Sequence, residues 1–105
     1  MSARVGSIED NRLGGWYSYR ASKAALNMLV KTAAVEYERR AKNVRLLLFH
    51  PGTVDTNLSK PFQSKSSTKL MQPSEVAMSL IKFMDRSDTG SNIEFIDWEG
   101  KKINW

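Results

Sequence analysis

The sequence predicts an α/β fold built on parallel strands, because helical and strand-like segments alternate along the chain. Residues 16–41 and the segment that starts at Pro73 carry apolar residues at helical spacing. Residues 44–49 form an apolar run that does not alternate with polar residues, and residues 93–98 form a second strand-like run. The order helix, buried strand, loop, helix, strand is that of half an open parallel sheet with right-handed crossovers.

The first predicted helix, residues 16–41, begins after Gly14-Gly15, which interrupts the preceding segment. Its apolar stripe consists of Leu26, Leu29, Val30, Ala33 and Tyr37. A polar stripe of the same period consists of Arg20, Asn27, Lys31 and Glu38. The two stripes predict an amphipathic helix with its apolar side toward the sheet.

The rest of the chain continues as strand, loop, helix and strand. His50-Pro51-Gly52 ends the first strand, and the polar residues 57–69 predict a long mobile loop. Pro73 suits the first turn of a helix, where its missing N–H has no helical partner. The apolar face of that helix is expected to be Val76, Ala77, Leu80, Ile81 and Met84. A chain of 105 residues holds these elements in one domain, residues 1–105.

Composition excludes several classes of protein. Sixteen Lys and Arg against eleven Asp and Glu give a net charge of +5, but the basic residues are scattered. A nucleic-acid partner is therefore not expected. No apolar run approaches the roughly 20 residues that span a bilayer, so no membrane partner is expected and the cytoplasm is the expected location. There is no cysteine, and the single histidine, His50, offers no ligand set for a metal.

One spacing in the first predicted helix has a chemical meaning. Tyr19 and Lys23 lie four residues apart, so their side chains share a helical face about one turn from each other. An ammonium beside a phenol stabilises the phenolate, which makes the phenol a usable general acid or base. The same spacing also occurs in helices where a surface tyrosine and a lysine merely share a face.

The surroundings of this pair resemble a known family. Tyr-Ser-Tyr-Arg-Ala-Ser-Lys-Ala-Ala-Leu-Asn, then a long helix, an apolar strand and His-Pro-Gly-Thr-Val-Asp-Thr, is similar to the C-terminal half of a short-chain dehydrogenase/reductase. Ser-Ala-Arg-Val-Gly-Ser-Ile and the ending Trp-Glu-Gly-Lys-Lys-Ile-Asn-Trp most resemble the C-factor-like and sniffer-like carbonyl reductase branch. The resemblance implies a partial Rossmann-type, doubly wound parallel sheet and an NAD(P)-dependent oxidoreductase that reduces carbonyls or oxidises alcohols.

The resemblance also implies roles for individual residues. Tyr19 matches the tyrosine that gives a proton to the substrate oxygen, and Lys23 matches the lysine that activates it and hydrogen-bonds the nicotinamide ribose. The residues that match the segment contacting the carboxamide end of the cofactor, NAD or NADP, are Pro51, Gly52, Val54 and Thr56. Residues 57–69 match the loop that covers a small carbonyl or alcohol substrate.

The catalytic serine of the family has two candidates in this chain. The family pattern Ser-x-x-Gly, with Gly6 as its glycine, places Ala3 where the serine stands in relatives. Ser2 lies one position earlier, and Ser7 lies one position beyond the glycine and nearer the usual distance from Tyr19. The sequence leaves the choice between Ser2 and Ser7 open.

The cofactor-phosphate half of the family domain has no counterpart in this chain. None of the six glycines forms G-x-G-x-x-G, the fingerprint that binds a pyrophosphate. The chain is therefore expected to be a fragment that is inactive in isolation and that requires the missing N-terminal half. Uncovered apolar faces predict a homo-oligomer if it does not find that half. The alternative is a non-catalytic truncated remnant that acts by association or signalling.

Overall fold

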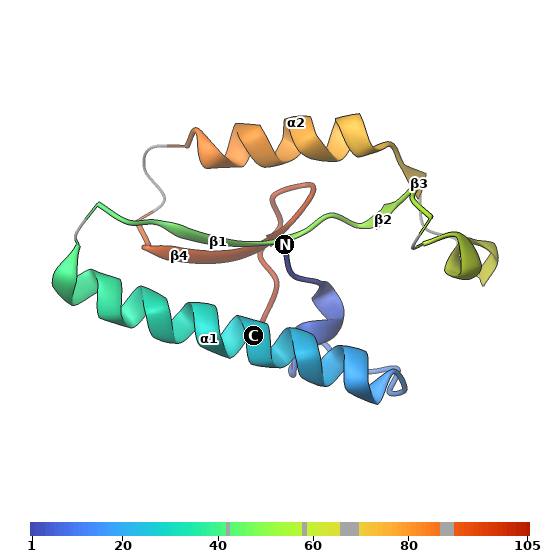
Figure 1. Ribbon diagram of the computed structural model, residues 1–105, viewed down its shortest axis with the longest axis horizontal. Coiled ribbons are helices and arrows are strands. Elements are labelled where there is room, and N and C mark those ends of the chain that lie inside the picture. The colour runs from blue at the N-terminus through green and yellow to red at the C-terminus, as the bar shows by residue number, and fades with distance from the viewer. Residues whose placement is uncertain (42, 58, 66–69, 87–89) are drawn as a thin grey trace.

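Two parallel strands lie between two helices that cover opposite faces of the sheet (Figure 1). The computed structural model describes residues 1–41, 43–57, 59–65, 70–86 and 90–105. Helix α1 spans Tyr17–Arg40, helix α2 Pro73–Met84, strand β1 Leu46–His50 and strand β4 Ile93–Asp97. The short elements are β2 (Thr53–Val54), β3 (Leu70–Met71) and the 3-10 helices η1 (Arg4–Gly6) and η2 (Lys60–Lys65). The predicted α/β class is confirmed.

The sheet is parallel, as the apolar run in residues 44–49 predicts. Strand β1 pairs with β4 from Leu46 opposite Ile93 to His50 opposite Asp97. Strands β2 and β3 form a second, smaller parallel pair. Alternate residues of each main strand enter different cores: Leu48 and Phe95 pack on the α1 side, with Ala34, Ile93 and Ile103. Phe49 and Ile96 pack on the α2 side, with Met71, Val76 and Phe83. Burial on both faces explains why these strands lack an alternating pattern.

Helix α1 has nearly the predicted bounds, but its buried face differs from the prediction. Leu29 and Tyr37 of the predicted apolar stripe are exposed, whereas Asn27 and Ala34 are the buried residues of the helix. Leu26 and Val30 are partly buried against the α1-side core. The helix therefore meets the sheet through Ala34 together with Leu26 and Val30. The polar Asn27 is buried where Ser2 supplies a hydrogen-bond partner.

Helix α2 begins at Pro73, as predicted, and its first turn is capped. The backbone N–H of Gln72 donates to Glu75 Oε2 at 2.8 Å, one half of a capping box. Val76 and Phe83 are buried, and Leu80 packs partly against the same core. Ala77, Ile81 and Met84 of the predicted apolar face are exposed. The predicted face therefore extends beyond what this chain covers.

The described part of the predicted loop at residues 57–69 contains a 3-10 helix. Helix η2 lies within it, and the pairing of β2 with β3 brings the two ends of the loop together. Residues 58 and 66–69 of the predicted loop lie outside the described residues. Within the described parts of the chain, no helix is both long and apolar enough to cross a membrane.

Candidate functional site

Tyr19 and Lys23 lie on successive turns of α1 and face each other. The Lys23 ammonium is 5.9 Å from the centroid of the Tyr19 ring. Tyr19 is 50% exposed, and Lys23 is half-buried. The spacing of four residues produces this arrangement because side chains four apart on a helix are neighbours.

Helix η1 fixes the position of this part of α1. A Cβ built on Gly6 would lie 2.7 Å from Cβ of Lys23 and 2.8 Å from the Lys23 carbonyl carbon. Only a glycine therefore permits this contact without displacing one of the two backbones. The contact places the 3-10 helix directly against the turn that carries Lys23.

The same 3-10 helix connects α1 with the carboxyl end of the sheet (Figure 1). The N–H of Ser2, just before η1, donates to the carbonyl of Phe49 at 2.9 Å, near the end of β1. The Arg4 guanidinium donates to Asp97 Oδ2 at 2.9 Å, at the end of β4. In parallel α/β sheets, ligands bind at the carboxyl ends of the strands. The Tyr19 helix and the segment that leaves β1 at Pro51 are thus connected through η1.

The two candidate serines are buried and hydrogen-bonded within the chain. Ser2 Oγ donates to Asn27 Oδ1 at 2.6 Å. Ser7 Oγ donates to the carbonyl of Trp105 at 3.3 Å and accepts the N–H of Asp10 at 3.1 Å. Ala3, at the position of the family's serine, is also buried. These contacts give both hydroxyls a structural partner, and the choice between them stays a prediction.

The four residues predicted at the carboxamide end of the cofactor follow β1 in one short segment. Pro51 and Gly52 form the turn after the strand, and Val54 lies in β2 opposite Met71. Thr56 is exposed, and its hydroxyl accepts the N–H of Ser59 at 3.3 Å. This hydrogen bond shapes the turn that leads from β2 into residues 57–69.

The surroundings of His50, the last residue of β1, shift its pKa. Burial lowers the pKa of His50 to about 4, and Arg4 lowers it as well, whereas Asp97 raises it. Its Nδ1 is buried and has no hydrogen-bond partner among the described residues. His50, at the end of β1, is therefore neutral near pH 7.

The sequence prediction did not include Asn27, Arg4 or Arg20 among the residues that shape the site. Asn27 continues the four-residue spacing of Tyr19 and Lys23 by one more turn, which is a signal that a pattern can show. Arg4 bonds Asp97, 93 positions away, and Arg20 bonds the carbonyl of Val5, 15 positions away, and spacing alone does not show these partners.

A comparison with protein families matches residues 4–67 to the short chain dehydrogenase model. That match covers more than half of the chain and includes the Tyr19–Lys23 pair and the turn after β1. The chain belongs to the short-chain dehydrogenase family.

Individual relatives of this short-chain dehydrogenase extend well beyond it in length. A Rhodococcus 1-hydroxy-2-glutathionyl-2-methyl-3-butene dehydrogenase is 37% identical over 105 residues, which are 100% of this chain and 45% of the relative. The C-signal protein of Myxococcus xanthus is 31% identical, over 100% of this chain and 58% of its own length. The chain thus spans about half the length of these relatives.

Solved structures of the family agree with the fold. The carbonyl reductase Sniffer of D. melanogaster superposes with a TM-score of 0.76 at 28% identity, over 100% of this chain and 39% of that one. An NADPH-bound carbonyl reductase from chicken fatty liver gives a TM-score of 0.75 at 32% identity, over 99% of this chain and 40% of that one. The short-chain dehydrogenase fold is therefore shared over essentially all of this chain.

Proposed function

We propose that this chain supplies the proton-transfer half of an NAD(P)-dependent carbonyl reductase or alcohol dehydrogenase of the C-factor-like and sniffer-like branch. The observation that carries the proposal is the Tyr19–Lys23 pair, with the Lys23 ammonium 5.9 Å from the Tyr19 ring and both side chains accessible. Tyr19 gives a proton to the substrate oxygen during reduction and takes one during oxidation. Lys23 stabilises the phenolate left by that transfer.

The described residues fit one end of a nicotinamide cofactor. Lys23 is half-buried, and its ammonium would donate to the ribose hydroxyls of the cofactor. Pro51 and Gly52 leave β1 at the edge where parallel sheets bind ligands and would hold the carboxamide end, together with Val54 and Thr56. When bound, the reduced cofactor, NADH or NADPH, would supply the hydride for carbonyl reduction, and the oxidised form would accept it in alcohol oxidation. The proposal of NADP as one of the two cofactors is supported by the NADPH in the chicken carbonyl reductase.

The proton that Tyr19 gives away has to reach an oxygen held close to the phenol. In relatives a serine hydroxyl polarises that oxygen, and Ser2 and Ser7 remain the candidates for this role. Both hydroxyls donate to an oxygen of the chain, Asn27 Oδ1 and the Trp105 carbonyl respectively. Either serine would have to exchange that acceptor for the substrate oxygen.

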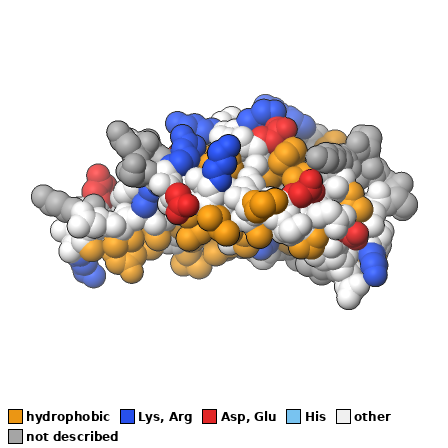
Figure 2. All heavy atoms as spheres, turned by 90° about the horizontal axis from the view of Figure 1, so that it is seen from above, with side chains coloured by type: hydrophobic (Ala, Val, Ile, Leu, Met, Phe, Trp, Pro, Cys, Tyr) orange, Lys and Arg blue, Asp and Glu red, His pale blue; other side chains and the backbone are white. Residues whose placement is uncertain are grey.

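The upstream half of a full-length relative is the proposed partner of this chain. Strand β1 pairs with β4 along one edge, and a groove of about 380 Å³ follows its other edge. Apolar residues and one arginine line this groove: Met1, Arg45, Leu46, Leu47, Phe49, Leu80 and Met84. In Figure 2 hydrophobic side chains gather along one long edge of the face seen from the α2 side. The hydrogen bond from Ser2 to Phe49 already extends the sheet on this edge, so a strand preceding Met1 would continue along β1.

A homo-oligomer is the other way to cover apolar surface. Large apolar side chains on α1 stay exposed: Tyr17, Met28, Leu29, Val35 and Tyr37. Exposed apolar surface of this kind favours association. Sedimentation of the chain with and without an upstream half tests which of the two partners it takes.

The experiment joins the upstream half of the Rhodococcus relative to Met1 and follows NADPH oxidation with a panel of aldehydes and ketones. We expect Tyr19→Phe to lower turnover by about 100-fold or more, because the proton donor is removed while the ring stays. Tyr17→Phe is the matched control, since Tyr17 is 86% exposed on the same helix. Undiminished turnover in Tyr19→Phe would remove the assignment.

The alternative is a remnant that acts by association or signalling. It is supported by one relative, the protein from Myxococcus that is named C-signal. Calorimetric titration with NADPH and with NADH, run on the joined protein and on the upstream half alone, separates the two proposals. A remnant adds no heat of binding to that of the upstream half, whereas an assembled site saturates.

A further inference from the structure

The three residues before α1 have left-handed backbone conformations. The φ angles are 65° at Gly14, 69° at Gly15 and 51° at Trp16. Glycine adopts this region without a steric penalty, but tryptophan does not, so the turn is disfavoured at its last residue. Trp16 is also the N-cap of α1 and makes no side-chain capping hydrogen bond. Something other than a cap has to hold this turn.

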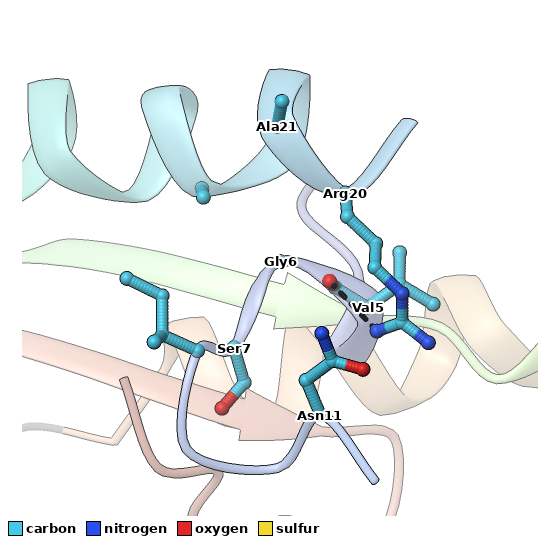
Figure 3. A pocket seen from close by; sticks show the side chains of 8 residues that line it. Val5, Gly6, Ser7, Asn11, Arg20 and Ala21 are labelled. Carbon is cyan, nitrogen blue, oxygen red and sulfur yellow. Dashed lines mark hydrogen bonds between the residues drawn. The ribbon is translucent and has the colours of Figure 1, made fainter. Parts of the chain in front are cut away.

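Arg20 supplies that hold. Its Nε donates to the carbonyl of Gly15 at 3.0 Å, and its Nη2 donates to the carbonyl of Gly14 at 3.2 Å. Its Nη1 donates to the carbonyl of Val5 at 3.3 Å, which Figure 3 shows as a dashed line. The guanidinium carbon also lies 6.0 Å from the centre of the Trp16 ring. Arg20 therefore binds the left-handed turn and η1 at the same time.

Apolar packing contributes little to this loop. Ile8 is 77% exposed and Leu13 is 90% exposed, and a cavity of about 160 Å³ lies between the loop, η1 and α1. Arg20 is among the residues that line the cavity, and its side chain extends along it toward Val5 and Asn11 (Figure 3). A loop without a core of its own depends on polar contacts for its position.

The bonds of Arg20 end close to both members of the proposed catalytic pair. Arg20 follows Tyr19 directly, and Val5 precedes Gly6, which contacts Lys23. The left-handed turn sets where α1 begins, and the first turn of α1 carries Tyr19. A change in the turn would therefore move the phenol relative to a substrate.

We infer that Arg20 is a positioning residue that holds the turn of Gly14, Gly15 and Trp16 closed and so fixes the orientation of Tyr19. We call the three hydrogen bonds from Arg20 to the carbonyls of Gly14, Gly15 and Val5 the clamp. The effect on catalysis rests on the proposed function, whereas the clamp does not depend on it. A planar guanidinium bonds three carbonyls at once, which a lysine ammonium on a flexible stem does not reproduce. Arg20→Lys therefore keeps the charge and removes the clamp.

Hydrogen exchange in the joined protein tests the clamp. We expect Arg20→Lys to speed exchange about ten-fold at the amides of Gly14 and residue 20, whose acceptors are Asn11 Oδ1 and the Trp16 carbonyl. Arg12→Lys is the matched control, because Arg12 is an exposed arginine of the same loop. Circular dichroism and the melting temperature confirm that each variant is folded. Unchanged exchange in Arg20→Lys overturns the clamp.

Kinetics of the same joined protein test the positioning. Arg20→Lys is expected to lower kcat about ten-fold, because a displaced proton donor slows the chemical step, while KM for NADPH stays within about two-fold. Guanidinium ion at millimolar concentration is expected to restore part of the activity of Arg20→Ala and none in Arg12→Ala. Faster exchange with unchanged kcat would show a clamp that does not position Tyr19 and would overturn the inference. A Tyr19→Phe variant with full activity would instead reject the proposed function. The hydrogen-exchange result alone would then decide whether Arg20 holds the turn.

Discussion

Gly6 lies directly against Lys23: a Cβ at position 6 would stand 2.7 Å from Cβ of Lys23 and 2.8 Å from its carbonyl carbon. We expect Gly6→Ala to force η1 and α1 apart and to destabilise the fold by about 1–3 kcal/mol, as overpacking of a close contact does. Urea denaturation measures the change. Ala25→Ser, which adds one atom at an exposed position of α1, is the control and should change stability by less than about 0.5 kcal/mol. Equal midpoints for Gly6→Ala and the parent would contradict the contact.

The buried hydrogen bond between Ser2 and Asn27 predicts that removing one partner destabilises the fold more than replacing both. Ser2→Ala leaves Asn27 Oδ1 without its donor at 2.6 Å, and Asn27 Nδ2 already has no partner among the described residues. An orphaned buried amide costs about 1–3 kcal/mol, whereas replacing both partners by apolar groups is close to neutral. The double variant Ser2→Ala with Asn27→Leu is therefore expected to be more stable than Ser2→Ala alone.

Thermal or urea unfolding of the parent, the two single variants and the double variant completes this cycle. Single effects that simply add in the double variant would mean that the two side chains do not interact energetically. The 2.6 Å hydrogen bond would then contribute nothing to holding residue 2 against α1.

The order and type of the main elements could be predicted because their signals are local. The 24 residues of α1 follow a helical period, and the apolar run before His50 indicates a strand buried on both sides. Which face of α1 is buried could not be predicted in the same way. Asn27 is buried because Ser2, 25 positions earlier, supplies its partner, and no helical pattern contains that information. Strands β2 and β3 have two residues each, too few to show a period.

In the candidate site too, contacts between residues close in sequence could be predicted, whereas contacts between distant residues could not. The neighbourhood of Tyr19 and Lys23 follows from a spacing of four residues on one helix, and the structure places the lysine over the tyrosine ring. The partners of Ser7 could not be read from the sequence, because its hydroxyl bonds the carbonyl of Trp105, 98 positions away. The Arg20 clamp likewise depends on a left-handed turn whose tryptophan has no sequence signal for a positive φ.

Arg4 bridges two carboxylates in unequal surroundings. Its distance to Asp97 is 2.9 Å and to Asp10 is 3.2 Å, but the Asp97 side chain is 7% exposed and that of Asp10 is 29% exposed. We expect Arg4→Gln to destabilise the fold by about 1–3 kcal/mol, because it leaves a buried carboxylate without its cation. Asp10→Asn should cost less than about 1 kcal/mol, since that ion pair is screened by water. Denaturation curves in which Asp10→Asn is less stable than Arg4→Gln would contradict the larger contribution assigned to the Arg4–Asp97 ion pair.

His50 gives the fold a pH dependence whose sign is fixed by its burial. Its pKa is about 4 in the folded chain against an ordinary value of 6.5, so the unfolded chain binds the proton more readily. The neutral imidazole stabilises the fold fully above about pH 6.5, and this contribution is lost as the pH falls toward about 4. Between about pH 7 and about pH 5 the loss amounts to about 2 kcal/mol. His50→Gln cannot titrate in this range, so the free energy of unfolding of the parent should fall more steeply than that of the variant. Urea denaturation at a series of pH values measures both curves, and curves that stay parallel from about pH 7 to about pH 5 would show that burial does not lower the pKa of His50.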